Sequence, residues 1–159
     1  MASATLHVCI TCRRPETTGE ALPRCADCPS GSGAKRVGPA CTGCCLGPAE
    51  GVEQVRAGAQ LLKEILACSL PEGVTVNPVE CLSACSQGCS VALSAPGKWS
   101  YVYGRIDPCL DAPAIIQGVA AYAASADGIV PWRQRPEIFR KQSLARIPPL
   151  ASPVEPPDV

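Results

Sequence analysis

The chain has 159 residues, and because 14 are Lys or Arg and 14 are Asp or Glu, its formal net charge at pH 7 is zero. A length of this order accommodates one domain with extensions, and balanced charge offers no broad electrostatic surface to nucleic acid. No apolar run approaches the roughly 20 residues of a membrane-spanning helix, so we expect neither a nucleic-acid partner nor membrane insertion.

Cysteine is the unusual feature of the composition, with twelve residues. The first eight residues show no basic start followed by a long apolar stretch, and hence no visible secretory signal. We therefore expect a cytoplasmic protein, whose thiols stay reduced and whose clustered cysteines bind metal.

The first half of the chain predicts two strands around one helix. Residues 5–8 form a short β-prone run, and residues 13–50 are rich in Gly, Pro, Ser and Thr, which predicts a loop-rich, Cys-rich insertion. Apolar residues then recur at helical spacing from Val55 through Gly58 and Leu62 to Ile65 and Leu66. Residues 74–79 are apolar and β-branched and form the second predicted strand.

The second half predicts a hairpin, a helix and a C-terminal strap. Residues 90–94 and 99–103 flank a Pro-Gly turn, and Asp111 can cap a helix that has Pro113 in its first turn. We expect residues 127–136 to pack Trp132 on the domain, a short helix over 136–141, and a solvated tail from Pro148, Pro149 and residues 153–159.

The order of these elements predicts an α/β fold in which a mixed sheet is flanked by helices. Residues 1–130 are expected to form the domain that carries the insertion at 13–50, and residues 131–159 an Arg- and Pro-rich strap and tail.

Five cysteines follow the two predicted parallel strands. Cys9 and Cys12 come after the first strand, and Cys81, Cys85 and Cys89 come after the second at four-residue spacing. A crossover helix between parallel strands puts both strand ends at one sheet edge, so the thiols can converge on an iron-sulfur cluster. Four of the five are needed, and Cys89 is the least favoured because it begins the outgoing strand.

Alternatives remain open for these thiols. Cysteines spaced by four residues could line the core face of a helix, but Gly88 and its small polar neighbours suit a loop better. Cys9 and Cys12 by themselves could equally form a redox dithiol.

The predicted insertion holds a second possible metal site. Its two Cys-x-x-Cys pairs are separated by twelve residues, which is close to the pattern of a four-cysteine zinc site, and consist of Cys25, Cys28, Cys41 and Cys44. The alternative is that these are unliganded loop thiols.

A cluster of positive charge lies near the C-terminus. Between positions 133 and 146 the sequence has one acidic residue, Glu137, and five basic residues, which are Arg133, Arg135, Arg140, Lys141 and Arg146. Such a run forms a solvated surface or docks an acidic redox partner.

Four motifs together resemble known families. They are Val8 to Arg13, Glu80 to Cys89, Pro96 to Tyr101 and Asp127 to Pro136. The order of elements and the Cys81 motif resemble the thioredoxin-like [2Fe-2S] ferredoxins, including the small thioredoxin-like subunit of respiratory complex I. The four motifs look more closely like a bacterial family of predicted metal-binding proteins of unknown function, often encoded near cobalamin-biosynthesis genes. The resemblance implies a thioredoxin-like fold with Cys9, Cys12, Cys81 and Cys85 as ligands.

Three functions follow from these patterns. The leading hypothesis is a one-electron carrier with a [2Fe-2S] cluster and a redox protein partner. The second is a protein that handles zinc, cobalt or iron, which the family resemblance would link to cobalamin metabolism. The third is thiol-disulfide exchange by Cys9 and Cys12, which is disfavoured because residues 13–19 do not begin an apolar helix that could lower a thiol pKa.

Overall fold

The computed structural model describes residues 4–12 and 56–150. Its sheet has five strands in the order β2-β1-β3-β4-β5. Their bounds are β1 Ala4–Cys9, β2 Val74–Val79, β3 Val91–Ser94, β4 Ser100–Tyr103 and β5 Ser143–Ile147. Strand β1 pairs in parallel with β2 and antiparallel with β3, and the remaining pairs are antiparallel. The predicted α/β class and mixed sheet are thus confirmed.

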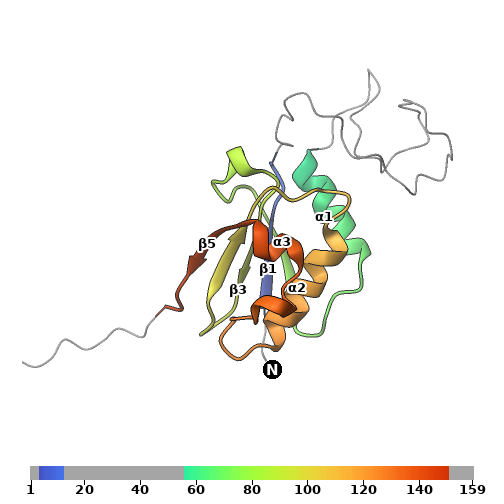
Figure 1. The fold of residues 1–159 in the computed structure, drawn as a ribbon. Helices are drawn as coiled ribbons and strands as arrows, with labels where there is room; N and C mark the ends of the chain where they lie inside the picture. Colours follow the sequence, from blue (N-terminus) through green and yellow to red (C-terminus); the bar gives the residue numbers. More distant parts are fainter. Residues whose placement is uncertain (1–3, 13–55, 151–159) are drawn as a thin grey trace, which may run out of the picture.

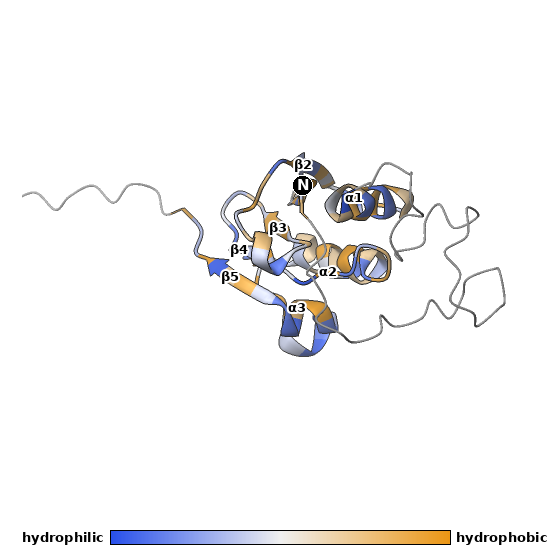
Figure 2. Ribbon diagram, turned by 90° about the horizontal axis from the view of Figure 1, so that it is seen from above, coloured by the Kyte–Doolittle hydropathy of each residue, from blue (hydrophilic) through white to orange (hydrophobic). Residues whose placement is uncertain are grey.

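Three helices cover one face of this sheet. They are α1 Ala57–Ala67, α2 Ala112–Ala124 and α3 Glu137–Lys141, with single 3-10 turns η1 Cys85–Gln87 and η2 Trp132–Gln134. Figure 1 shows α2 and α3 in front of the strands and α1 at the right, and the view from above in Figure 2 separates the helices from the sheet. None of the helices in the described part of the chain is long and apolar enough to cross a membrane.

The core lies between the sheet and the helices. Because strand side chains alternate between the two faces, Leu6 and Val8 of β1 are fully buried under the helices. Leu61 and Ile65 of α1 are fully buried with them. The helical period was predicted correctly, but Leu66, which was expected on this face, is 57% exposed. The buried stripe of α1 therefore runs through Gly58, Leu61 and Ile65.

The opposite face of the sheet carries small and polar side chains. His7 lies there, with Ser94 Oγ 2.9 Å from its Nε2 and Asn77 Nδ2 3.1 Å from its Nδ1. These contacts connect β1 to β3 and β2, and burial lowers the pKa of His7. This histidine acts as a polar link between the three strands.

The C-terminal segment differs from its prediction. Trp132 is 60% exposed, whereas Val130, Ile138 and Phe139 are buried and attach the segment to the domain. The short helix was predicted correctly, but strand β5 was not predicted. Its side chains are mostly exposed, so no alternating apolar pattern marks it in the sequence.

Asp111 precedes α2 as expected but does not cap it with its side chain. Its Oδ2 instead accepts a hydrogen bond from the backbone N–H of Asp107 at 2.8 Å. Burial raises the pKa of Asp111, and this hydrogen bond partly opposes the rise. The carboxylate thus stabilises the turn before α2.

Helix α3 is buried through Ile138 and Phe139, and the ring of Phe139 has two close neighbours. Phe139 stacks on Tyr103 with the ring centroids 4.0 Å apart, and its ring also lies against Gly118 of α2. A Cβ atom at Gly118 would stand 2.2 Å from the Phe139 ring.

Gly118→Ala should therefore destabilise the protein by about 1–3 kcal/mol, the usual cost of overpacking. The direction of the change in unfolding free energy is informative, because replacing Gly by Ala inside a helix otherwise stabilises a protein by about 1 kcal/mol. Urea unfolding measures the change, and the exposed neighbour Gln117→Ala is the control. Unchanged stability in Gly118→Ala would show that α3 does not pack as described.

Candidate metal centre

Two pairs of thiols meet at one edge of the sheet. Cys9 is the last residue of β1 and Cys12 follows the strand, and they are 1% and 2% exposed, whereas Cys81 and Cys85 follow β2 and are exposed. The register places Cys9 opposite Val79, the last residue of β2. The parallel pairing of β1 and β2 thus brings the two cysteine loops side by side, as the sequence predicted.

Hydrogen bonds tie the two loops together. The Cys9 thiol donates to the carbonyl of Glu80 at 3.5 Å, and the Thr11 hydroxyl donates to the same carbonyl. Charge on Cys9 contributes to raising the pKa of Cys85, after the larger effect of a hydrogen bond with Cys81. The thiols of the two loops therefore interact electrostatically.

The two buried thiols titrate in opposite directions. Burial raises the pKa of Cys9, but hydrogen bonds from the Cys12 thiol and from backbone N–H groups outweigh it and hold the pKa below its usual value. Burial raises the pKa of Cys12, and the hydrogen bond to Cys9 raises it further. Cys9 is thus the favoured thiolate of the pair.

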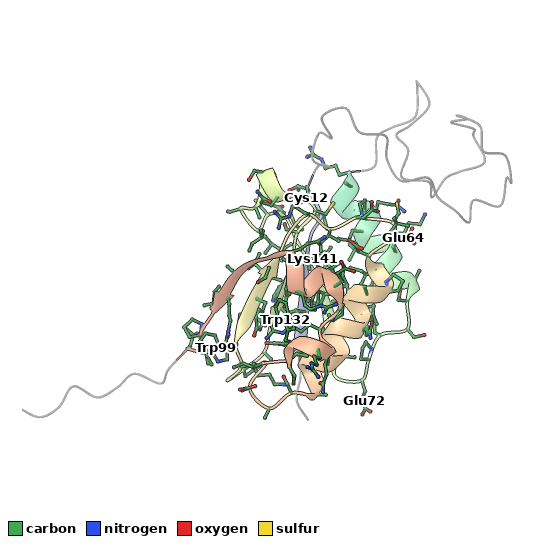
Figure 3. The ribbon with its side chains drawn as sticks, in the orientation of Figure 1. Cys12, Glu64, Glu72, Trp99, Trp132 and Lys141 are labelled. Carbon is green, nitrogen blue, oxygen red and sulfur yellow. The ribbon has the colours of Figure 1, made fainter. Side chains whose placement is uncertain are left out.

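The first turn of α1 contacts this loop directly. The N–H of Gly58 donates to the carbonyl of Cys12 at 3.2 Å, and Arg56 Nη1 donates to the carbonyl of Thr11 at 3.2 Å. A Cβ atom at Gly58 would lie 2.0 Å from the Cys9 carbonyl oxygen, so only glycine permits this approach. Figure 3 shows Cys12 beside the start of α1.

This contact brings a helix to the dithiol loop that the sequence did not predict. Residues 13–19, which were expected not to begin such a helix, lie outside the described residues, whereas α1 begins at Ala57 and its first turn donates to the backbone carbonyl of Cys12. The two segments are 44 residues apart between Cys12 and Arg56 in the sequence, so spacing could not reveal their contact.

Two further hydrogen-bond donors face the sulfur atoms. Ser90 is fully buried, with its Oγ 3.3 Å from Cys12 Sγ, and the backbone N–H of Ser83 lies 3.1 Å from Cys81 Sγ. Hydrogen bonds from Ser90 lower the pKa of Cys12 against the effect of burial. Ser90 was not predicted from the sequence, where its only signal is that a polar residue directly follows Cys89.

Cys89 lies beside the two pairs. Its side chain is fully buried, and the carbonyl of the following residue, Ser90, accepts a hydrogen bond from the N–H of Cys9 at 3.2 Å. Over residues 4–12 and 56–150, no three His, Cys, Asp or Glu side chains are grouped to hold one metal ion. The proposed second site, formed by Cys25, Cys28, Cys41 and Cys44, lies outside the described residues.

The donor set fits an iron-sulfur cluster by its chemistry. A [2Fe-2S] cluster takes four cysteine thiolates, and N–H and O–H groups that point at the sulfurs stabilise their negative charge. Cys9, Cys12, Cys81 and Cys85 supply the thiolates, and such donors face three of these four sulfur atoms.

Comparison with known proteins gives one match. Residues 39–149 match a family described as a protein of unknown function (DUF1636). This range includes Cys81, Cys85 and Cys89 and begins after Cys9 and Cys12. No curated protein and no solved structure matches the chain.

Ser90→Ala is expected to raise the pKa of Cys12 because the variant removes a hydrogen bond that favours the thiolate. The ¹³Cβ chemical shift of labelled cysteine, followed against pH in metal-free protein, reports each thiol separately. The control is Ser86→Ala, in the exposed turn η1, which should leave the pKa of Cys12 unchanged. A Cys12 titration at unchanged or lower pH in Ser90→Ala would contradict the assigned hydrogen bond.

Proposed function

The chain belongs to this family of proteins of unknown function, and we propose that it is a one-electron carrier with a [2Fe-2S] cluster held by Cys9, Cys12, Cys81 and Cys85. The observation that carries the proposal is the arrangement of these thiols as two pairs on two adjacent loops. Two irons with two protein ligands each require such a set.

The strand order supports a thioredoxin-like fold. Strands β1 and β2 are parallel and joined through α1, while β3 and β4 form an antiparallel hairpin followed by α2. This βαβ-ββα order is the one that the resemblance to thioredoxin-like ferredoxins implies, and it puts the cysteines at the ends of the adjacent strands β1 and β2.

Each pair of thiols has its own role in the proposal. Cys9 and Cys12 bind from the buried side, where Ser90 donates to Cys12 and the sheet and α1 exclude water. Cys81 and Cys85 bind from the exposed side, with the Ser83 N–H directed at Cys81. When bound, the cluster supplies an oxidation state that changes by one electron.

In this proposal, hydrogen bonds to the cysteine sulfurs tune the reduction potential of the cluster. Donors directed at the sulfurs favour the more negative state and so raise the reduction potential, whereas burial lowers it. The exposed pair Cys81 and Cys85 gives a protein partner the shortest approach to the centre.

A second candidate function is thiol-disulfide exchange by Cys9 and Cys12. It is favoured by the contact between Gly58 and Cys12, because a helix N-terminus stabilises a nearby thiolate. The lowered pKa of Cys9 and the raised pKa of Cys12 give the unequal pair that such exchange uses. Against it, both thiols are almost completely buried.

Protein purified without air is expected to be red-brown, with iron and acid-labile sulfide at about two of each per chain. Replacing Cys9, Cys81 or Cys85 by Ala should remove the colour, and Cys12 and Cys89 compete for the fourth position, where we favour Cys12. Cys68→Ala is the control because Cys68 donates to the Glu64 carbonyl at the end of α1.

Colourless protein with stoichiometric zinc would contradict the electron carrier and favour the metal-handling function. Loss of the colour in Cys89→Ala and its retention in Cys12→Ala would reverse the assignment of the fourth ligand. Zinc found in addition to iron would support the second site in the insertion.

The exchange function predicts a reversible Cys9–Cys12 disulfide in the Cys81→Ala/Cys85→Ala double variant. Alkylation and mass spectrometry across dithiothreitol redox buffers measure its potential. Gly58→Ala should shift that potential, because the Cβ atom displaces the helix N-terminus that stabilises the thiolate. A pair that never oxidises, or a potential that Gly58→Ala leaves unchanged, would exclude this candidate.

A further inference from the structure

Positive charge is concentrated on one side of the domain. The exposed residues Arg105, Arg133, Arg140, Lys141 and Arg146, with the half-buried Arg135, form what we term the basic face, and Trp132 lies among them. Figure 2 shows α3 and β5 on the side of the molecule opposite α1 and β2. That opposite side carries Glu64, Glu72 and Glu80. Because the chain has no net charge, this face is a local property of the fold.

Two guanidinium groups of the basic face, those of Arg135 and Arg146, lie over aromatic rings. The Arg146 guanidinium lies 4.1 Å from the Trp99 ring centroid and 5.9 Å from that of Tyr101. The Arg135 guanidinium lies 6.0 Å from the Tyr101 ring and 5.9 Å from the Trp132 ring, while its Nε donates to the Val130 carbonyl. These stacked contacts fix the side chains and reduce the entropy that binding would cost.

Only one cation of the basic face has a carboxylate partner among the described residues. Lys141 pairs with Glu137 across one turn of α3. Arg105, Arg133 and Arg146 form no ion pair with any residue of 4–12 or 56–150, and Arg140 contributes to lowering the pKa of Glu137 without forming an ion pair with it, so these charges are available to an external anion. Trp132, which is 60% exposed beside Arg133, adds an apolar contact. Trp and Arg are the residues most enriched at the centres of protein interfaces.

The basic face continues to the exposed thiols. The N–H of Arg105 donates to the carbonyl of Gln87 in turn η1, which begins at Cys85, and Arg105 Nη2 donates to the Lys141 carbonyl at 3.2 Å. A Cβ atom at Gly104 would stand 2.8 Å from the Gln87 carbonyl and 2.6 Å from the Leu144 side chain. Gly104 and Arg105 therefore connect the cysteine loop to β5 and to the end of α3.

From these contacts we infer that the basic face is the docking surface for an acidic protein, which it positions beside Cys81 and Cys85. Complementary charge steers such a partner to the surface and fixes its orientation, and Trp132 provides the apolar anchor. Docking itself needs no metal, so evidence against the electron-carrier function would not by itself contradict the docking surface.

Fluorescein-labelled poly-L-glutamate is the probe, and its anisotropy with the full-length protein at low salt gives the Kd. Arg133→Glu and Arg140→Glu should each weaken binding about fivefold, the upper range for an exposed charge pair. Trp132→Ala should weaken it about tenfold, as for an interface anchor. Lys63→Glu makes the same charge change on α1 and should alter the Kd less than twofold.

Thermal unfolding checks that each variant folds, which the exposure of all four side chains favours. The Cys81→Ala/Cys85→Ala variant should bind the probe as the wild type does, which separates docking from metal binding. The inference is overturned if the wild type does not bind the probe or if Lys63→Glu weakens binding as much as Arg133→Glu. It is also overturned if oligothymidylate of equal charge binds more tightly, since the face would then fit nucleic acid.

Discussion

The parallel pairing of β1 with β2 is the constraint on which the candidate site depends. It fixes Cys9 opposite Val79, so the loops that leave the two strands must start at the same edge. The backbone hydrogen bond from Ile10 to the Val79 carbonyl, at 2.9 Å, extends this pairing beyond the strands. A slip of one residue would turn Leu6 and Val8 away from the core, so burial of these side chains also holds the cysteine loops in place.

The candidate site also depends on the close approach of α1 to the loop that carries Cys9 and Cys12. The helix touches the Cys9–Ile10 peptide through Gly58, and its other buried residues, Leu61 and Ile65, continue the same stripe into the core. Packing of the helix and position of the dithiol loop are therefore coupled. A side chain at Gly58 would affect both, which explains how core packing can act on thiol chemistry without any direct contact with sulfur.

The site and the basic face are joined through the loop that carries Cys85. That loop lies against Gly104, which Leu144 of β5 also approaches, and accepts a hydrogen bond from the N–H of Arg105. Strand β5, whose side chains are mostly exposed, is held by pairing with β4 and by stacking of Arg146 on Trp99. The C-terminal segment thus completes the sheet and supports the exposed side of the cysteine cluster.

Much of this architecture could be read from local pattern. The two parallel strands, the hairpin, the two longer helices and the short helix each follow from periodicity or turn residues, and cysteine placement identified both loops. Local pattern was misleading where exposure depends on distant neighbours. Leu66 and Trp132 were expected to be buried, but Leu61 and Phe139 occupy the space against the core.

The sequence by itself determined the fold class, the crossover that brings the loops of Cys9 and Cys81 to one edge, and the presence of cysteine side chains there. Only the tertiary structure decided that the N-terminus of α1 reaches Cys12, that Ser90 faces its sulfur, and that β5 joins the sheet. The physical reason is that these contacts join residues far apart in the chain and depend on one glycine, one hydroxyl and one exposed strand. None of these three produces a periodic signal.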